Sequence, residues 1–173
     1  MSKRTSRFWD RVAKLIPSEG LSESAVRIFD AASEYIDTNT SVLDAGCGQG
    51  DLTIALARRA QSVLAIDISA EMIRCASASA EKRNATNVAF SHASLDEVGV
   101  TDLGFDVITA FGVLPYVTDL EALFHQVDRL LMPGGVFLSA TACLRQRRTL
   151  FGAAIWTLAK LRLTPPTQLF KLG

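Results

Sequence analysis

The sequence VLDAGCGQGD at residues 42–51 is the strongest structural signal in this chain. It joins a short apolar, β-branched run to three closely spaced glycines, and residues 52–60 continue with the 3.6-residue periodicity of a helix. Glycines at such a turn allow positive φ angles and let the backbone approach a ligand closely. The stretch therefore predicts a strand, a ligand-binding loop and a helix in succession.

The rest of the chain repeats this alternation of strands and helices. Apolar, β-branched runs predict strands at residues 41–44, 62–67, 87–90, 105–110 and 136–140. Helical spacing predicts helices at residues 22–37, 52–60, 69–83 and 119–131, with Ser69 as an N-cap. Strands joined by helices indicate an α/β fold with a Rossmann-like, doubly wound, mostly parallel sheet and helices on both faces.

Ligands on such sheets bind beyond the carboxyl ends of the strands. We therefore expect the functional residues at positions 44–51, 67–69, 90–95 and 111–116. The fold alone does not name the ligand.

The glycine loop does not suit a phosphate-bearing ligand. A dinucleotide fingerprint GxGxxG that starts at Gly46 needs its third glycine at position 51, where the chain has Asp51. Asp44 adds a second carboxylate, and two like charges about 4 Å apart repel by ~4 kcal/mol at an effective dielectric constant of 20. A P-loop is excluded as well, because no Lys-Ser/Thr pair follows the glycines.

A cationic nucleoside fits these carboxylates better. Asp67 ends the second predicted strand, about 20 residues after the glycines, a spacing from which a carboxylate reaches a ribose diol. S-adenosylmethionine carries a sulfonium and an ammonium group and has no phosphate. The sequence therefore favours this cofactor.

Four motifs, in order, resemble those of class I S-adenosylmethionine-dependent methyltransferases. They are residues 44–50, 65–72, 105–108 and the LLMPGG sequence at 130–135, and the resemblance covers roughly residues 8–140. Within the family the chain is most similar to small-molecule methyltransferases of the ubiquinone-biosynthesis and magnesium-protoporphyrin kind. The resemblance implies methyl transfer to a small acceptor. The basic residues near both ends of the chain leave an anionic acceptor open, and the apolar residues 150–163 leave a hydrophobic one open.

The resemblance also implies a set of cofactor-binding residues. Asp44 and the backbone of Gly46 and Gly48 would hold the methionine part, and Asp67 would bind the ribose hydroxyls. The alternative role for Asp44 and Asp67 is a helix cap or a surface charge. The full implied set is Asp44, Gly46, Cys47, Gly48, Asp67, Ile68, Met72, Ser94, Leu95 and Phe111.

The remaining members of this set would border the adenine and the acceptor. Ile68 and Met72 would pack against the adenine, and Tyr116 would face the substrate. Ser94 stands where the family often has an acidic residue that bonds the adenine amino group. For Met72, Phe111 and Tyr116 the alternative is ordinary core packing.

No catalytic residue emerges from the sequence. Methyl transfer from a sulfonium is a direct displacement, in which alignment of the reactants is worth about 7–11 kcal/mol. His92 and His125 are the only histidines, and neither is assigned as a base. Two alternative functions stay open: a cofactor-binding but catalytically inactive domain, and an NAD-dependent oxidoreductase.

Composition narrows the setting. The chain has 18 basic and 18 acidic residues, so its charge does not indicate nucleic-acid binding. Cys47, Cys75 and Cys143 lack the close spacing of a metal or redox site, and reduced thiols fit a cytoplasmic protein. No signal peptide is evident, and the apolar residues 150–163 are too few to span a membrane.

The motifs divide the chain into three parts. Residues 1–40 are expected to form N-terminal helices that cover the site, and residues 41–140 the cofactor-binding core. Residues 141–173 are expected to be a basic and apolar lid-like segment in which the family's last two strands are missing, as in a truncated chain. Its residues 145–163 would either pack as a lid helix or contact a membrane surface.

Overall fold

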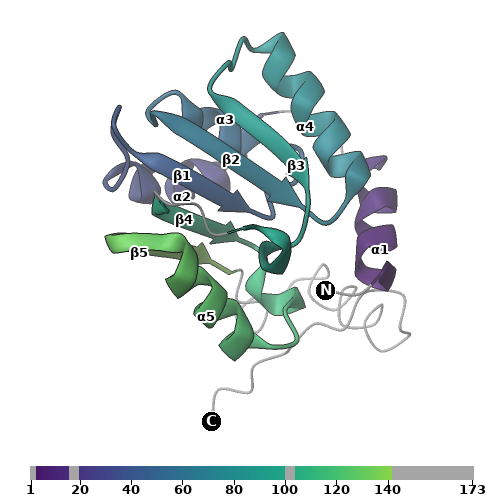
Figure 1. The fold of residues 1–173 in the computed structure, drawn as a ribbon. Helices are drawn as coiled ribbons and strands as arrows, with labels where there is room; N and C mark the ends of the chain where they lie inside the picture. Colours follow the sequence, from purple (N-terminus) through teal and green to yellow (C-terminus); the bar gives the residue numbers. More distant parts are fainter. Residues whose placement is uncertain (1–2, 16–19, 100–103, 142–173) are drawn as a thin grey trace.

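The computed structural model describes residues 3–15, 20–99 and 104–141 (Figure 1). Five strands form one sheet in the order β3-β2-β1-β4-β5, and every neighbouring pair is parallel. This confirms the predicted Rossmann-like α/β fold. The strands are β1 (Ser41–Ala45), β2 (Ser62–Asp67), β3 (Val88–His92), β4 (Phe105–Phe111) and β5 (Leu131–Ala140).

Helices cover both faces of the sheet. The α-helices are α1 (Lys3–Ala13), α2 (Glu23–Ser33), α3 (Asp51–Ala57), α4 (Ala70–Lys82) and α5 (Leu120–Leu130), and the 3₁₀ helices are η1 (Leu95–Glu97) and η2 (Leu114–Tyr116). Side chains of α2 and α3 pack on one face of the sheet, whereas α5 and the loop that contains η1 pack on the other. α4 packs against β2, β3 and α3, and α1 packs against α4.

The two faces of β1 have different neighbours because successive side chains of a strand alternate. Val42 belongs to the core cluster under α2 and α3, and Leu43 and Ala45 belong to the cluster under α5. Asp44 therefore lies on the α3 face and Ala45 on the α5 face.

Several helix ends differ from the sequence prediction, and α3 ends at Ala57 instead of residue 60. α2 ends at Ser33 instead of residue 37, although Ile36 in the following loop is 2% exposed. Apolar periodicity reports burial, and a buried loop residue extends the pattern beyond the helix. α5 ends at Leu130, and β5 begins at once, with Leu131 paired to Phe105.

The Pro-Gly-Gly sequence at residues 133–135 lies inside β5 rather than between helix and strand. The pairing of β4 and β5 shifts register there, between Phe105 and Val107. A Cβ on Gly135 would lie 3.0 Å from the carbonyl oxygen of Asp106, so a larger residue would push the two strands slightly apart.

The predicted lid-like segment at residues 141–173, with its basic part at 145–163, lies outside the described residues apart from Thr141. The expectation about two missing family strands concerns the same region. Within the described part of the chain, no helix is long and apolar enough to span a membrane.

Candidate functional site

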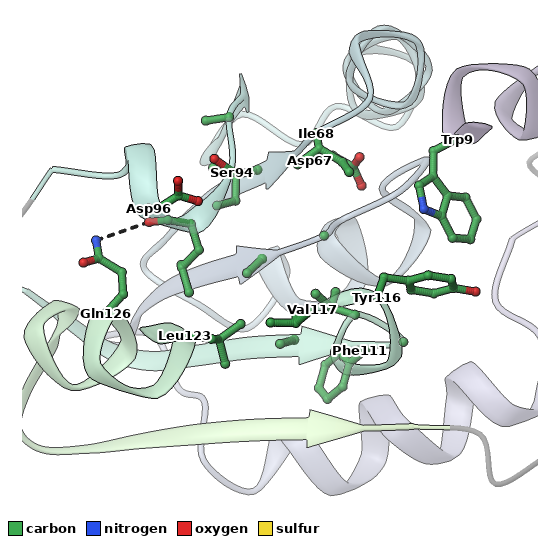
Figure 2. A pocket seen from close by; sticks show the side chains of 18 of the residues that line it. Trp9, Asp67, Ile68, Ser94, Asp96, Phe111, Tyr116, Val117, Leu123 and Gln126 are labelled. Carbon is green, nitrogen blue, oxygen red and sulfur yellow. Dashed lines mark hydrogen bonds between the residues drawn. The ribbon is translucent and has the colours of Figure 1, made fainter. Parts of the chain in front are cut away.

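A cavity of about 500 Å³ lies at the carboxyl ends of β1, β2 and β4 (Figure 2). β1 has β2 on one side and β4 on the other, so the strand order reverses here, and α/β sheets bind ligands at this point. The loops after four strands and parts of α1 and α5 form its walls. Nine residues named from the sequence line it: Gly46, Gly48, Asp67, Ile68, Met72, Ser94, Leu95, Phe111 and Tyr116.

Asp67 is held in place by backbone donors. The N–H of Gly48 donates to one carboxylate oxygen at 3.0 Å, and the N–H of Ser69 donates to the other at 2.8 Å. Burial raises the pKa of Asp67, and these two hydrogen bonds oppose the rise. The carboxylate therefore borders the cavity in a fixed orientation.

The glycine loop lies against the loop that follows β4. Gly46 has a φ of +81°, and its N–H donates to the carbonyl of Ile66 at 2.8 Å. A Cβ at this position would overlap Cγ2 of Val113. Gly46 is therefore required both by its left-handed conformation and by the contact between the two loops.

Asp44 and Cys47 are not among the residues that line the cavity. The Asp44 side chain is on the α3 face of the sheet, where its carboxylate accepts hydrogen bonds from Thr53 and Thr109. Burial raises the pKa of Asp44. Burial also raises the pKa of the Cys47 thiol, with Asp44 and Asp67 adding to the effect, so the thiol stays protonated.

Ser94 caps η1 in the loop that follows β3. Its N–H and its hydroxyl both donate to the Glu97 carboxylate, at 2.8 and 2.7 Å, in a capping box at the start of η1. Asp96 also lines the cavity, and sequence analysis missed this residue. The signal was available, because Ser-x-x-Glu is a capping-box pattern and places Asp96 in the first turn of a helix.

Gln126 ties α5 to the same loop. Its side-chain amide donates to the carbonyls of Leu95 and Val98, at 3.2 and 3.0 Å. Figure 2 shows Gln126 and Asp96 at one end of the cavity and Trp9 and Tyr116 at the other. The cavity is thus elongated, with a polar and an aromatic end.

Trp9 was also missed, and it brings α1 to the cavity. The rings of Trp9 and Tyr116 meet edge to face, with centroids 5.1 Å apart. α1 is anchored by Asp10, whose carboxylate accepts from the Ser69 hydroxyl at 2.7 Å and from the N–H of Glu71 at 3.3 Å. Of the predicted N-terminal cover, α1 therefore contributes directly to the cavity wall.

The charged residues that line the cavity are all acidic: Asp67, Asp96 and Asp119. No lysine, arginine or histidine is among the described lining residues. His92 is exposed and hydrogen-bonds the carbonyl of Ile68 at 3.0 Å, and His125 is exposed on α5. Over the ranges that the structure describes, no cluster of three or more His, Cys, Asp or Glu could hold a metal ion.

Comparison with known protein families identifies the family of this chain. The family described as "Methyltransferase domain" matches residues 36–164. The chain belongs to this methyltransferase family. Solved structures similar to this chain include a methyltransferase that depends on S-adenosylmethionine, the cofactor that the glycine loop predicts.

Individual methyltransferases and one cyclase are similar to parts of the chain. Ubiquinone biosynthesis O-methyltransferase of Psychrobacter arcticus is 38% identical over 102 residues, which make up 58% of this chain and 40% of that protein. The chain thus spans less than half the length of this relative. An S-adenosylmethionine-dependent methyltransferase from Mesorhizobium loti superposes with a TM-score of 0.58 and 28% identity, over 68% of this chain and 53% of that one.

The cyclase SpnF superposes with a TM-score of 0.61 and 26% identity, over 65% of this chain and 43% of that one. Similar structures therefore include a protein named for a reaction other than methyl transfer. The fold of a methyltransferase does not by itself establish turnover.

Proposed function

We propose that this methyltransferase transfers a methyl group from S-adenosylmethionine to a small, apolar acceptor. The observation that carries the proposal is Asp67, fixed by two backbone N–H groups at the wall of a cavity whose charged lining is acidic. Such a site suits a ligand that presents ribose hydroxyls and positive charge, and it repels phosphates.

The residues around the cavity match the parts of the cofactor. Asp67 would accept hydrogen bonds from the ribose hydroxyls, and the backbone of Gly46 and Gly48 would border the methionine part. Ile68 and Met72 would pack against the adenine. The bound cofactor supplies a methyl group on a cationic sulfur, and the chain's task is to exclude water and align the acceptor.

The acceptor side is apolar. Trp9, Tyr116, Phe111, Val117 and Phe137 contribute aromatic and aliphatic surface to the cavity. Because the charged groups in the wall are carboxylates, an anionic acceptor is disfavoured over a neutral one. Burial raises the pKa of Tyr116, so its hydroxyl is neutral and can donate a hydrogen bond to the acceptor.

A second candidate is a domain that binds the cofactor without transferring its methyl group. The observation behind this candidate is the likeness to the cyclase SpnF, which has a similar structure and is named for a different reaction. The two candidates differ in one product: only a methyltransferase converts S-adenosylmethionine to S-adenosylhomocysteine when an acceptor is supplied.

The first experiment is thermal unfolding with S-adenosylhomocysteine, with NADH as the control ligand. At 100 times its dissociation constant the ligand should add ~2.7 kcal/mol of stability, a rise of about 5–10 °C in melting temperature. Asp67→Asn should abolish most of the rise. Asp106→Asn is the matched control. The Asp106 carboxylate is also hydrogen-bonded, but its partner is Ser41, at the amino-terminal ends of the strands and away from the cavity. A rise with NADH, or none with either ligand, would contradict the proposal.

We also propose a cytoplasmic location. Cys47 and Cys75 are free thiols in the structure, as expected in a reducing compartment. Cell fractionation that recovers the protein in an oxidising compartment would exclude this location.

A further inference from the structure

A carboxylate and two hydroxyls form a buried cluster beneath the glycine loop. Thr53 donates to one oxygen of Asp44 at 2.6 Å, and Thr109 donates to the other at 2.8 Å. Both threonines are fully buried, and Asp44 is 3% exposed. Each carboxylate oxygen therefore accepts a hydrogen bond from one hydroxyl. We name Asp44, Thr53 and Thr109 the Asp44 cluster.

The Asp44 cluster joins three elements whose ends shape the cavity. Asp44 is the last but one residue of β1, and Thr53 lies in the first turn of α3, so the two residues flank the glycine loop. Thr109 lies on β4 directly opposite Asp44 in the strand register. The cluster thus fixes both ends of the glycine loop relative to the neighbouring strand.

The position of these elements matters because the loops above them are in contact. Gly46 has no room for a Cβ against Val113, which follows β4. Interiors packed this closely transmit small displacements to their neighbours. A shift of β1 or α3 relative to β4 would therefore displace the wall that Gly46, Gly48 and Phe111 form.

We propose that Thr53 and Thr109 are positioning residues for cofactor binding and act through Asp44. The resemblance implies a direct contact between Asp44 and the cofactor, whereas the geometry points to an indirect role on the far face of the sheet. Thr53 and Thr109 belong to no motif identified in the sequence. This inference rests on the proposed function, since the ligand in its test is S-adenosylhomocysteine.

The test is isothermal titration of the full chain with S-adenosylhomocysteine. Thr53→Val and Thr109→Val keep the side-chain shape and remove the hydroxyl, so each should weaken binding about tenfold or more. The single variants Thr53→Ser and Thr109→Ser keep the hydroxyl and should bind S-adenosylhomocysteine with an affinity within about twofold of the wild type. The double valine variant should lose less than the product of the single losses, because both hydroxyls share Asp44.

Thr40→Val is the matched control. Thr40 is also a buried threonine whose hydroxyl donates to a carboxylate, that of Asp37 at 2.9 Å, but it directly precedes the opposite end of β1. Thr40→Val should lower the melting temperature and leave the affinity for S-adenosylhomocysteine unchanged. This comparison separates a general loss of stability from a loss of positioning.

Cysteine variants cover the case in which a valine variant does not fold. Thr53→Cys and Thr109→Cys keep a weak donor and should weaken binding several-fold, between the serine and valine variants. Equal affinities across the series, with stability alone reduced, would overturn the inference. Absence of binding by the wild-type chain would refute the proposed function instead.

Discussion

Gly46→Ala should be the most damaging single substitution in the glycine loop. The position has a φ of +81°, and a non-glycine residue in the left-handed region costs about 1–2 kcal/mol. The new Cβ would also overlap Cγ2 of Val113, and overpacking of this kind costs about 1–3 kcal/mol. We therefore expect the free energy of unfolding to fall by about 2–5 kcal/mol.

Gly134→Ala separates the two contributions. Gly134 has a φ of +83°, and a Cβ there would have no neighbour within 4 Å, so only the conformational cost applies. Urea unfolding followed by circular dichroism should place Gly46→Ala about 1–3 kcal/mol below Gly134→Ala. Adding Val113→Ala to Gly46→Ala should cost less than the sum of the single effects, because the smaller side chain removes the overlap.

Equal stabilities of the two alanine variants would refute the steric argument. Additive effects of Gly46→Ala and Val113→Ala would refute it independently. Binding of S-adenosylhomocysteine should weaken in Gly46→Ala and stay unchanged in Gly134→Ala, since Gly46 lines the cavity and Gly134 does not.

Three further substitutions address the supports of the site and the sheet. Asp106→Asn should destabilise the fold by ~1 kcal/mol at pH 7. The hydrogen bonds from Ser41 lower the pKa of Asp106, so the charged carboxylate stabilises the folded protein at pH values above the unfolded pKa of ~3.9. This stabilisation is lost as the pH falls through the lowered pKa. Urea unfolding of the wild type and the variant at pH 7 and pH 3 would reveal the loss. Ser69→Ala removes the cap that accepts from the N–H of Met72 and should cost about 1–2 kcal/mol in the same assay; an unchanged midpoint would contradict the capping role. Gln126→Leu should weaken binding of S-adenosylhomocysteine in calorimetry, because two loop carbonyls lose their donor; equal affinity would show that the loop keeps its position without it.

The sheet and the edge that binds the ligand could be predicted from sequence for a simple reason. Apolar, β-branched runs marked all five strands, and β2 has the predicted bounds at residues 62–67. In a parallel sheet every carboxyl end meets one edge, so the residues after each strand converge without further information. Asp67, Ser94 and Phe111 were found in this way, and all three line the cavity.

Contacts between distant segments could not be predicted in the same way. Trp9 reaches the cavity because Asp10 accepts a hydrogen bond from Ser69, 59 residues later, and no local pattern encodes this pairing. The position of Asp44 has a related cause. Alternation along β1 shows that Asp44 and Ala45 face opposite sides, but only the packing of α3 and α5 determines which side borders the cavity.

The double hydrogen bonding of Asp67 has a thermodynamic consequence for ligand capture. An exposed side chain that is immobilised only when a ligand arrives loses rotamer freedom worth about 0.5–1.5 kcal/mol. For Asp67 the N–H groups of Gly48 and Ser69 impose that loss during folding. The receptor carboxylate is thus preorganised, and the entropic penalty of ordering it belongs to the stability of the protein rather than to its affinity.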